Sequence, residues 1–131
     1  MILRNVNPND YQFLFDLLKE RNKYISINFS MPTFEQHLRF CVSKPYSVWK
    51  MITNGNEKMG HIYLTNKNEI GIFIRKSLSN KGIGSQAIEM FLKSNPQKNY
   101  IANINSHNTM SIDFFTKHGF KPKEIVMSLD N

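Results

Sequence analysis

The 131 residues include one cysteine, Cys41, and this scarcity excludes an intramolecular disulfide and a zinc site built from several cysteines. A lone cysteine is typical of the reducing cytoplasm. No apolar stretch approaches the length of about 20 residues that a membrane-spanning helix needs. The first residues lack the basic and then apolar layout of a secretory signal. We therefore expect a cytoplasmic protein with no membrane partner, formed as one domain over residues 1–131.

Acidic residues are also few. The chain has 10 Asp and Glu against 17 Lys and Arg, which gives a formal net charge of +7 at pH 7. Such a surplus favours an anionic partner: nucleic acid, a membrane surface or a phosphorylated small molecule. The lysines are scattered rather than gathered in runs, so we expect no nucleic-acid partner and favour the small molecule.

Hydrophobic periodicity predicts the order β-α-α-β-β-β-α-β-α-β, an α/β (α+β layered) protein with a mixed central β-sheet flanked by about four helices. Asn9 or Asp10 is expected to cap the first helix, and Thr33 the second. Asn54-Gly55 predicts a hairpin turn, and Gly119 the end of the last helix. Strands are predicted at residues 2–6, 46–53, 59–65, 69–74, 100–104 and 123–129, and the two later helices at about 84–94 and 109–118.

Residues 80–85, with the sequence Asn-Lys-Gly-Ile-Gly-Ser, place two glycines directly before a predicted helix. Glycine lets the backbone approach a ligand closely because it has no Cβ atom. The start of a helix presents unpaired N–H groups and the positive end of its dipole to an anion. A P-loop and a dinucleotide fingerprint each need residues that are missing here. From the turn alone, an anion site and a plain tight connection are equally good interpretations.

A second motif favours the anion site. In residues 108–120, the positions of Asn108, Ser111, Lys117, Gly119 and Phe120 match N-x-x-[AS]-x-x-x-Y-x-K-x-G-F. Together with Lys81-Gly82-Ile83-Gly84, this segment resembles the GNAT superfamily of N-acetyltransferases. The whole chain follows the element order of that family, and the likeness is strongest between residues 69 and 120.

The resemblance implies that acetyl-CoA is the co-substrate. In that family the pantetheine arm pairs with the strand before the turn, and the backbone of the turn holds the pyrophosphate. The residues that the resemblance implies for CoA binding are Ile72, Phe73, Ile74, Arg75, Asn80, Lys81, Gly82, Ile83, Gly84, Ser85, Asn108, Phe115 and Lys117.

Two positions depart from the family pattern. Asn80 stands where a glycine is common, and we expect it to replace that glycine because asparagine tolerates the left-handed conformation. Phe115 stands where the family often has a tyrosine as general acid, and phenylalanine has no proton to give. Since a thiol of pKa about 8.5 leaves as a moderately stable thiolate, its proton can come from water or from another side chain.

Glu69 is the candidate for the base that takes a proton from the attacking amine. It begins the strand expected to carry the acetyl group, and it shares a face with Gly71 and Phe73. A solvent-exposed carboxylate at a hairpin end explains Glu69 nearly as well. His61 and Tyr63, on one face of the neighbouring strand, are candidates for relaying protons or shaping the acceptor site. No His, Asp and Glu cluster has metal-ligand spacing, so no metal is predicted.

The first two helices form the acceptor side in this family. Arg21-Asn22 and the segment around His37 and Arg39 are similar to bacterial GNAT enzymes that acetylate nucleotide-linked amino-sugars. The implied acceptor is therefore a primary amine on such a sugar, bound by Arg21, Asn22, His37 and Arg39. The alternatives are a helix-end cap for Arg21, a core-edge position for His37 and a surface position for Arg39.

Other functions remain open at this point. Acetylation of a protein N-terminus or of a ribosomal protein is a second interpretation, and a non-catalytic CoA-binding or nucleic-acid-binding domain is a third. After Phe120, only Lys121-Pro122-Lys123 precedes the last predicted strand, so the loop that often closes over the acceptor in this family is short or absent. An open site, or a homodimer whose second subunit completes it, is the expectation.

Overall fold

Polar turns divide the chain into helices and strands close to the predicted places. The computed structural model describes residues 1–21 and 30–131, with Arg21 described by its backbone alone. The elements in chain order are β1 (Ile2–Asn5), the 3-10 turn η1 (Pro8–Asp10), α1 (Tyr11–Arg21), α2 (Phe34–Val42), β2 (Val48–Asn54), β3 (Glu57–Leu64), β4 (Ile70–Ile74), the 3-10 turn η3 (Lys76–Leu78), α3 (Ile83–Ser94) and α4 (Thr109–Lys117).

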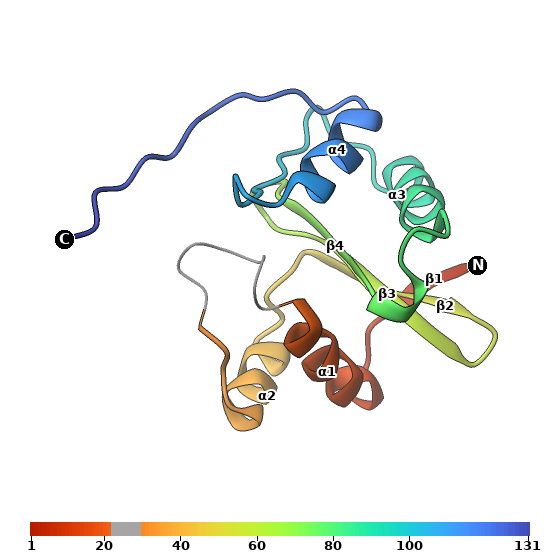
Figure 1. The fold of residues 1–131 in the computed structure, drawn as a ribbon. Coiled ribbons are helices and arrows are strands. Elements are labelled where there is room, and N and C mark those ends of the chain that lie inside the picture. Colours follow the sequence, from red (N-terminus) through yellow and green to blue (C-terminus); the bar gives the residue numbers. More distant parts are fainter. Residues whose placement is uncertain (22–29) are drawn as a thin grey trace.

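The four strands of the described chain form an antiparallel sheet in the order β1-β2-β3-β4. Figure 1 shows α1 and α2 on one side of this sheet, and α3 and α4 on the other. The α+β fold class predicted from the sequence is therefore confirmed. Successive side chains of β3 point to opposite faces of the sheet. Ile62 and Leu64 pack in the core with α3, while His61 and Tyr63 face α1 and α2.

Several turn and cap predictions are confirmed. Thr33 caps α2 through a capping box with Gln36. Gly55 follows β2 with φ of +61°, and Gly119 follows α4 with φ of +92°. The first cap differs from the prediction, because a 3-10 turn precedes α1 and Asn7, rather than Asn9 or Asp10, caps that turn. The Asn7 side chain accepts from the Asn9 amide and closes a capping box with Asp10, which adds the turn η1 before α1.

A buried ionic cluster joins this first turn to the sheet. The carboxylate of Asp10 is fully buried and pairs with Arg4 at 2.7 Å and with Lys58 at 2.9 Å. Burial alone would raise the pKa of Asp10, but the hydrogen bonds from Arg4, the Asn7 amide and Lys58 outweigh it and lower the pKa to about 2. The cluster therefore contributes to stability only while Asp10 is ionised.

The strand predicted at residues 100–104 is reduced to one parallel bridge between Glu69 and Ile101. Ile101 accepts from the Ile70 amide and donates to the Asn68 carbonyl, and the segment then leaves the sheet. Asn103 and Asn105 bond through their side chains to Glu69 and to the His107 amide, in the manner that makes asparagine unfavourable in strands. The prediction of a mixed sheet with this strand as a full member was therefore wrong.

The prediction of a strand at residues 123–129 was also wrong. Residues 121–131 are exposed and have no assigned secondary structure, and Figure 1 shows them leading away from the rest of the molecule. The apolar pattern that predicted the strand is present, but a strand also needs a neighbour for its backbone hydrogen bonds. No described strand pairs with this segment.

Candidate active site

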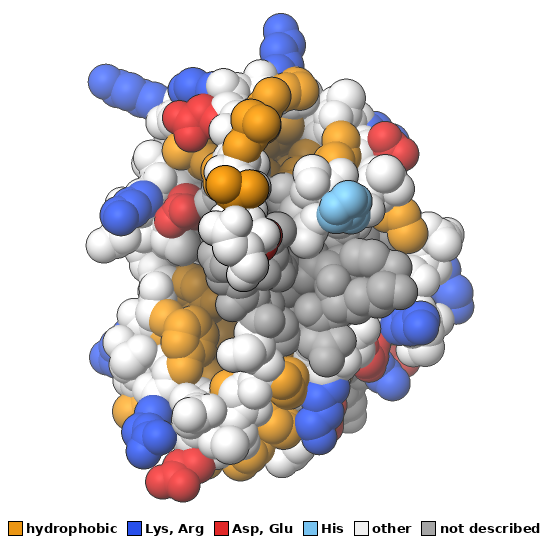
Figure 2. All heavy atoms as spheres, turned by 60° about the vertical axis from the view of Figure 1, so that its left-hand side comes forward, with side chains coloured by type: hydrophobic (Ala, Val, Ile, Leu, Met, Phe, Trp, Pro, Cys, Tyr) orange, Lys and Arg blue, Asp and Glu red, His pale blue; other side chains and the backbone are white. Residues whose placement is uncertain are grey.

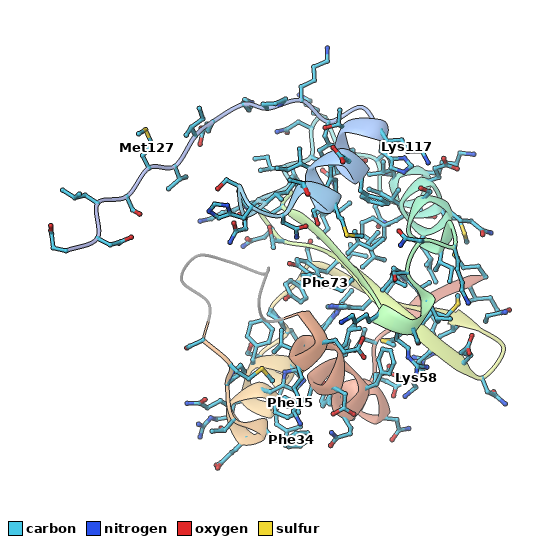
Figure 3. The ribbon with its side chains drawn as sticks, in the orientation of Figure 1. Phe15, Phe34, Lys58, Phe73, Lys117 and Met127 are labelled. Atoms are coloured by element: carbon cyan, nitrogen blue, oxygen red, sulfur yellow. The ribbon has the colours of Figure 1, made fainter. Side chains whose placement is uncertain are left out.

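Two cavities meet at three aromatic side chains. The larger, of about 340 Å³, lies between the sheet and the two helices α1 and α2, and the smaller, of about 190 Å³, lies between β4 and the segment 103–105. Tyr46, Tyr63 and Phe73 line both cavities. Figure 3 shows Phe73 on the side of the sheet that faces α1 and α2. A molecule in one cavity can therefore meet a molecule in the other at these rings.

Gly71 makes room for Tyr63 at this junction. The two residues lie opposite each other in the pairing of β3 with β4. A Cβ atom on Gly71 would lie 2.2 Å from the Tyr63 ring, so only glycine allows the ring to lie over the strand. On its other side Tyr63 stacks on Tyr46, with ring centroids 3.9 Å apart and an interplanar angle of 16°.

Both tyrosines remain protonated at neutral pH. Burial raises the pKa of Tyr46 far above its usual value, and the nearby Tyr63 raises it further by charge and by hydrogen bonding. Burial also raises the pKa of Tyr63, although its hydrogen bond with Tyr46 opposes this. The two rings are stacked, so each tyrosine contributes to the burial of the other. The junction thus holds two neutral phenols close to the smaller cavity.

His61 lines the larger cavity, and Trp49 fixes its ring. The indole Nε1–H of Trp49 donates to Nδ1 of His61 at 2.9 Å. In a neutral ring the proton then lies on Nε2, so the nitrogen that could take up a proton is already in use. This arrangement favours a role for His61 in shaping the cavity over a role as proton acceptor. Its ring also stacks on Phe73, with centroids 5.5 Å apart.

Glu69 lines the smaller cavity. Its carboxylate accepts from Asn103 at 2.6 Å and from the Thr65 hydroxyl at 3.1 Å. These bonds fix the carboxylate next to the parallel bridge that Glu69 itself forms with Ile101. Of the three predicted catalytic residues, Glu69 and Tyr63 share the smaller cavity, and His61 and Tyr63 share the larger. The role of Glu69 as base stays a prediction.

The edge of β4 offers backbone groups to the smaller cavity. Thr65 donates to the Glu69 carbonyl and Arg75 donates to the Met59 carbonyl, so the odd-numbered residues of this strand bond to β3. Alternation along the strand directs the N–H and C=O of Ile72 toward the opposite side, where the cavity lies. The predicted strand for the pantetheine arm therefore has its central residue in position to pair with an extended ligand.

The glycine turn leads from the end of β4 into α3. Asn80 has φ of +61°, which confirms that it replaces a glycine in the left-handed conformation. Gly82 caps α3 with φ of +77° and offers no side-chain hydrogen bond to the first turn of the helix. A Cβ atom on Gly84 would lie 3.2 Å from the Phe114 ring and 3.8 Å from Ile74. The start of α3 thus packs tightly on α4 and on the end of β4.

Backbone N–H groups near left-handed residues form concave anion sites, and a helix start adds its dipole. The turn has both features. Arg75 follows β4 directly, and Lys81 is an exposed side chain within the turn. Ser85, in the first turn of α3, forms a hydrogen bond of 3.0 Å with Nε2 of His118 at the end of α4. The turn therefore combines both features of an anion site, and Ile83 begins the helix.

The residues of the motif at 108–120 lie in two places, some beside the smaller cavity and others at the C-terminal end of α4. Asn108 and Phe115 line the smaller cavity, and Asn108 also caps α4 by accepting from the Ser111 amide at 3.1 Å. Lys117 is exposed in the last turn of α4 (Figure 3) and does not line that cavity. The next residue, His118, forms the contact with Ser85 at the start of α3.

The predicted acceptor residues are not gathered in one place. His37 lines the larger cavity and is nearly buried, with Nε2 at 3.1 Å from the Tyr11 carbonyl. Burial lowers its pKa, so the ring is neutral and joins α2 to α1. Arg39 points outward, 70% exposed and 3.6 Å from Glu35, and lines neither cavity. The side chain of Arg21 and all of Asn22 lie outside the described residues.

Sequence reasoning missed much of the larger cavity. Tyr46 was placed only as part of a strand, although it lies before β2 and lines both cavities. Trp49 was not singled out, although it lines the larger cavity and fixes His61. Leu14, Leu17 and Phe40 follow a helical spacing that also fits core residues, so no signal in the sequence separates the two roles. Only the packing of α1 and α2 on β2 and β3 assigns them to a cavity wall.

Charge is dispersed over the face in Figure 2. Lys and Arg side chains lie apart from one another there and form no continuous stripe. Within residues 1–21 and 30–131, no three His, Cys, Asp or Glu side chains gather where a metal ion could bind. Over the same part of the chain, no helix has the length and apolar character required to cross a bilayer.

Comparisons with known proteins agree with this geometry. The acetyltransferase (GNAT) domain family matches residues 1–121. A peptidyl-lysine N-acetyltransferase, YjaB of Salmonella typhimurium, is 31% identical over 74 residues. That match covers 56% of this chain and 50% of the relative, so the chain spans about half of the relative's length in the match.

Solved structures share the fold. A domain from Methanocaldococcus jannaschii has a TM-score of 0.81 and 26% identity, over 94% of this chain and 89% of that one. An aminoglycoside antibiotic 6'-N-acetyltransferase from Acinetobacter haemolyticus has a TM-score of 0.70 and 15% identity, over 100% of this chain and 98% of that one. At such low identity the second likeness concerns the fold alone.

Proposed function

Since this chain belongs to the acetyltransferase (GNAT) domain family, we propose that it transfers the acetyl group of acetyl-CoA to a primary amine. In this proposal residues 1–131 act as a single catalytic domain. The protein is placed in the cytoplasm, as the single cysteine suggests, and cell fractionation would test that location.

One observation supports this proposal above the others. Ile72 of β4 is directed into the smaller cavity, and the chain continues from β4 through η3 to a helix start that has two left-handed residues and no side-chain cap. An extended pantetheine arm needs the first feature, and a diphosphate needs the second. The ligand set proposed from this observation is Ile72 to Arg75 along the strand, and residues 80–85 in the turn.

The chemistry requires a neutral amine, a polarised carbonyl and a leaving group. When bound, acetyl-CoA supplies an acetyl thioester. The N–H of Ile72, on the cavity side of β4, is the proposed donor to the carbonyl oxygen, where it stabilises the developing negative charge. As the amine forms its C–N bond, the C–S bond breaks and the sulfur leaves as a thiolate, which receives the proton lost by the amine.

Two side chains are proposed to handle that proton. Glu69 is the proposed base, held by Asn103 and Thr65 beside the smaller cavity. Tyr63 lies at the junction and is the proposed hydrogen-bond donor to the thiolate, in the place of the tyrosine that Phe115 replaces. Because burial raises the pKa of Tyr63 above that of a thiol, full proton transfer from Tyr63 is uphill, and water completes the step.

Two acceptors follow from the sequence and the comparisons. A nucleotide-linked amino-sugar is the acceptor predicted from Arg21, Asn22, His37 and Arg39. A peptide lysine is the second, because the relative in Salmonella typhimurium is named for that substrate. Acetylation of an N-terminus or of a ribosomal protein belongs to the same chemistry, and one assay can compare all of these amines.

The test combines binding with turnover. Titration calorimetry at low ionic strength is expected to show acetyl-CoA binding, and release of free thiol is expected only when a suitable amine is added. Binding without thiol release from any amine would indicate a CoA-binding domain without catalysis. Absence of binding by folded protein would overturn the proposed function. Glu69→Gln is expected to lower kcat at neutral pH by roughly 10²-fold or more, and unchanged turnover would remove Glu69 as the base.

We propose further that a second copy of the chain pairs with the C-terminal segment. Ile125, Val126, Met127 and Leu129 are between 81% and 88% exposed, and Figure 3 shows Met127 far from the helices. Ile101 bonds to β4, so alternation directs the backbone of Ala102 to the opposite edge of that segment. An apolar extended segment fits such an edge.

Light scattering on eluted protein tests this homodimer. The chain of 131 residues is expected to be a dimer at micromolar concentration, and a chain that ends at Lys121 is expected to be a monomer. A monomeric full chain would contradict the proposal, and so would a dimer that persists after truncation.

A further inference from the structure

Aromatic rings form a continuous wall along the larger cavity. Tyr46 contacts Phe40 at 5.8 Å and Trp49 at 4.9 Å between ring centroids, and both pairs meet edge to face. The wall continues through the stacked ring of Tyr63 and the stacked pair of His61 and Phe73. The rings come from α2, from β2 and the residues before it, and from β3 and β4, so tertiary packing alone assembles them.

Charge is nearly absent from this cavity. Leu14, Leu17, Leu18 and Pro32 form the side opposite the sheet, and Ser30 and Gln36 add a few polar atoms. None of the described lining residues is Asp, Glu, Lys or Arg. The nucleotide of a nucleotide-linked sugar carries phosphates that need cations, and its sugar carries hydroxyls that need hydrogen bonds. The described lining offers few partners for either.

The position of the cavity fixes how an acceptor would lie. Its amine must reach Tyr46, Tyr63 and Phe73, because among the described lining residues these three also line the cavity along β4. The rest of the acceptor then lies against Trp49 and the leucines of α1. A flat ring covers these flat walls face to face, whereas a straight lysine side chain contacts them along a narrow strip and gains less dispersion energy.

The same lining suits the amine itself. An ammonium group is attracted to the faces of aromatic rings during entry. Once it is inside an apolar cavity, desolvation favours the neutral amine over the ammonium ion, and only the neutral amine can attack. The proton that the amine loses leaves with water or with Glu69, so no further reactant is required.

We infer that the acceptor is a small primary amine carried by a short chain on an aromatic ring. This inference rests on the proposed acetyl transfer and specifies its second substrate. The recognition comes from the ring faces of Trp49, Tyr46, Tyr63 and Phe73, and the amine lies where the two cavities meet.

Trp49 is the single tryptophan of the chain, so its fluorescence reports directly on the cavity. Titration without acetyl-CoA compares 2-phenylethylamine with glucosamine and with an N-acetyl-lysine amide, all at one pH. The aromatic amine is expected to change the emission saturably, with a Kd at least tenfold lower than those of the other two amines. Equal or tighter binding of glucosamine or of the lysine amide would overturn the inference.

Two variants on α2 distinguish an effect on the cavity wall from a general effect on the helix. Phe40→Ala removes one ring from the wall and is expected to raise the Kd for 2-phenylethylamine about tenfold, with the affinity for acetyl-CoA unchanged. Val42→Ala is the control, since Val42 is 68% exposed and lines neither cavity. Equal effects of both changes would contradict the assigned role of the wall.

Thiol release distinguishes this inference from the proposed function. Saturable quenching by 2-phenylethylamine with no thiol release would leave the cavity assignment supported and would remove the proposed catalysis. Thiol release with the sugar or the lysine amide, but no quenching by the aromatic amine, would support the proposed catalysis and overturn the inference about the acceptor.

Discussion

The two cavities of this protein differ in the part of the chain that lines them. The cavity along β4 offers the backbone of Ile72, whereas aromatic and aliphatic side chains line the larger cavity. A backbone recognises groups that are the same in every turnover, such as an amide arm and a diphosphate. Side chains can change without changing the fold, so they suit the substrate that differs between relatives.

This difference explains why the motifs at residues 80–85 and 108–120 carry the strongest family resemblance, while the aromatic wall of the larger cavity has no such motif. Gly82 and Asn80 are visible in the sequence because a left-handed backbone restricts which residues are allowed. Tyr46 and Trp49 are not visible in this way, because aromatic residues are common in strands that line no cavity. The predictions below test how independent the two cavities are.

The largest effect is expected where the cavities meet. Gly71→Ala places a Cβ atom 2.2 Å from the Tyr63 ring, so the ring must leave its position between the two cavities. We expect kcat to fall on the order of 100-fold and the free energy of unfolding to fall by about 1–3 kcal/mol. Thiol release and urea unfolding measure the two quantities.

The double variant Gly71→Ala with Tyr63→Ala is the control for that clash. With the ring removed, the new Cβ atom has space, so the loss of stability should be smaller than the sum of the two single losses. Strict additivity would show that the ring and the glycine do not compete for space.

Asp10→Asn should affect stability while leaving both cavities unchanged. It removes the charge that pairs with Arg4 and Lys58, and we expect unfolding to become easier by about 2 kcal/mol at pH 7. The pKa of Asp10 is lowered to about 2 in the folded protein from 3.8. Its contribution is therefore complete above about pH 4 and disappears as the pH falls toward 2.

Urea unfolding of the unchanged protein and of Asp10→Asn at several pH values measures the difference in their free energies of unfolding. The two stability curves should converge below about pH 2, and the KM for either substrate should change less than twofold. Curves that stay parallel down to pH 2 would contradict the assigned pKa.

Asn80→Asp should weaken the binding of acetyl-CoA and leave the binding of the acceptor amine unchanged. It keeps the shape and the left-handed preference of Asn80 but adds a negative charge beside the proposed diphosphate. We expect the KM for acetyl-CoA to rise about fivefold, equivalent to roughly 1 kcal/mol, and less at high salt. Asn66→Asp, the same change in the exposed loop between β3 and β4, is the control and should have no effect.

The smallest effect is expected at Arg39. Its guanidinium is 70% exposed and lies 3.6 Å from the carboxylate of Glu35, on the outer side of α2. Arg39→Ala should cost at most about 0.5 kcal/mol of stability and change the acceptor KM less than twofold. A tenfold rise in that KM would show that the acceptor extends over α2, as the similarity to amino-sugar enzymes implies.

Local rules predicted much of the fold. Thr33 and Gln36 form the expected capping box, and Gly55 and Gly119 take the expected positive φ values. The cap of α1 was assigned to Asn9 or Asp10 because both are good cap residues. The choice of Asn7 depends on Asp10 turning inward to Arg4, which is a contact with the sheet.

The predicted strands at the C-terminal end failed for a related reason. Residues 100–104 and 123–129 have apolar patterns suited to strands, yet one forms a single bridge and the other forms no pair within the described chain. A pattern describes which face a segment can bury, but a strand also requires a neighbour. That neighbour is a property of the assembled structure, or of a second chain.

By itself the sequence determined the cap of α2 at Thr33, the turns at Gly55 and Gly119 and the glycine-rich start of α3, because each depends on the allowed conformations of one or two residues. It also determined the family, because the two motifs lie at a fixed separation. Only the tertiary structure decided that Tyr46, Tyr63 and Phe73 join two cavities and that the larger one is walled by rings. These residues come from separate strands and a connecting segment, and their distances exist only once the sheet and its two layers of helices have packed together.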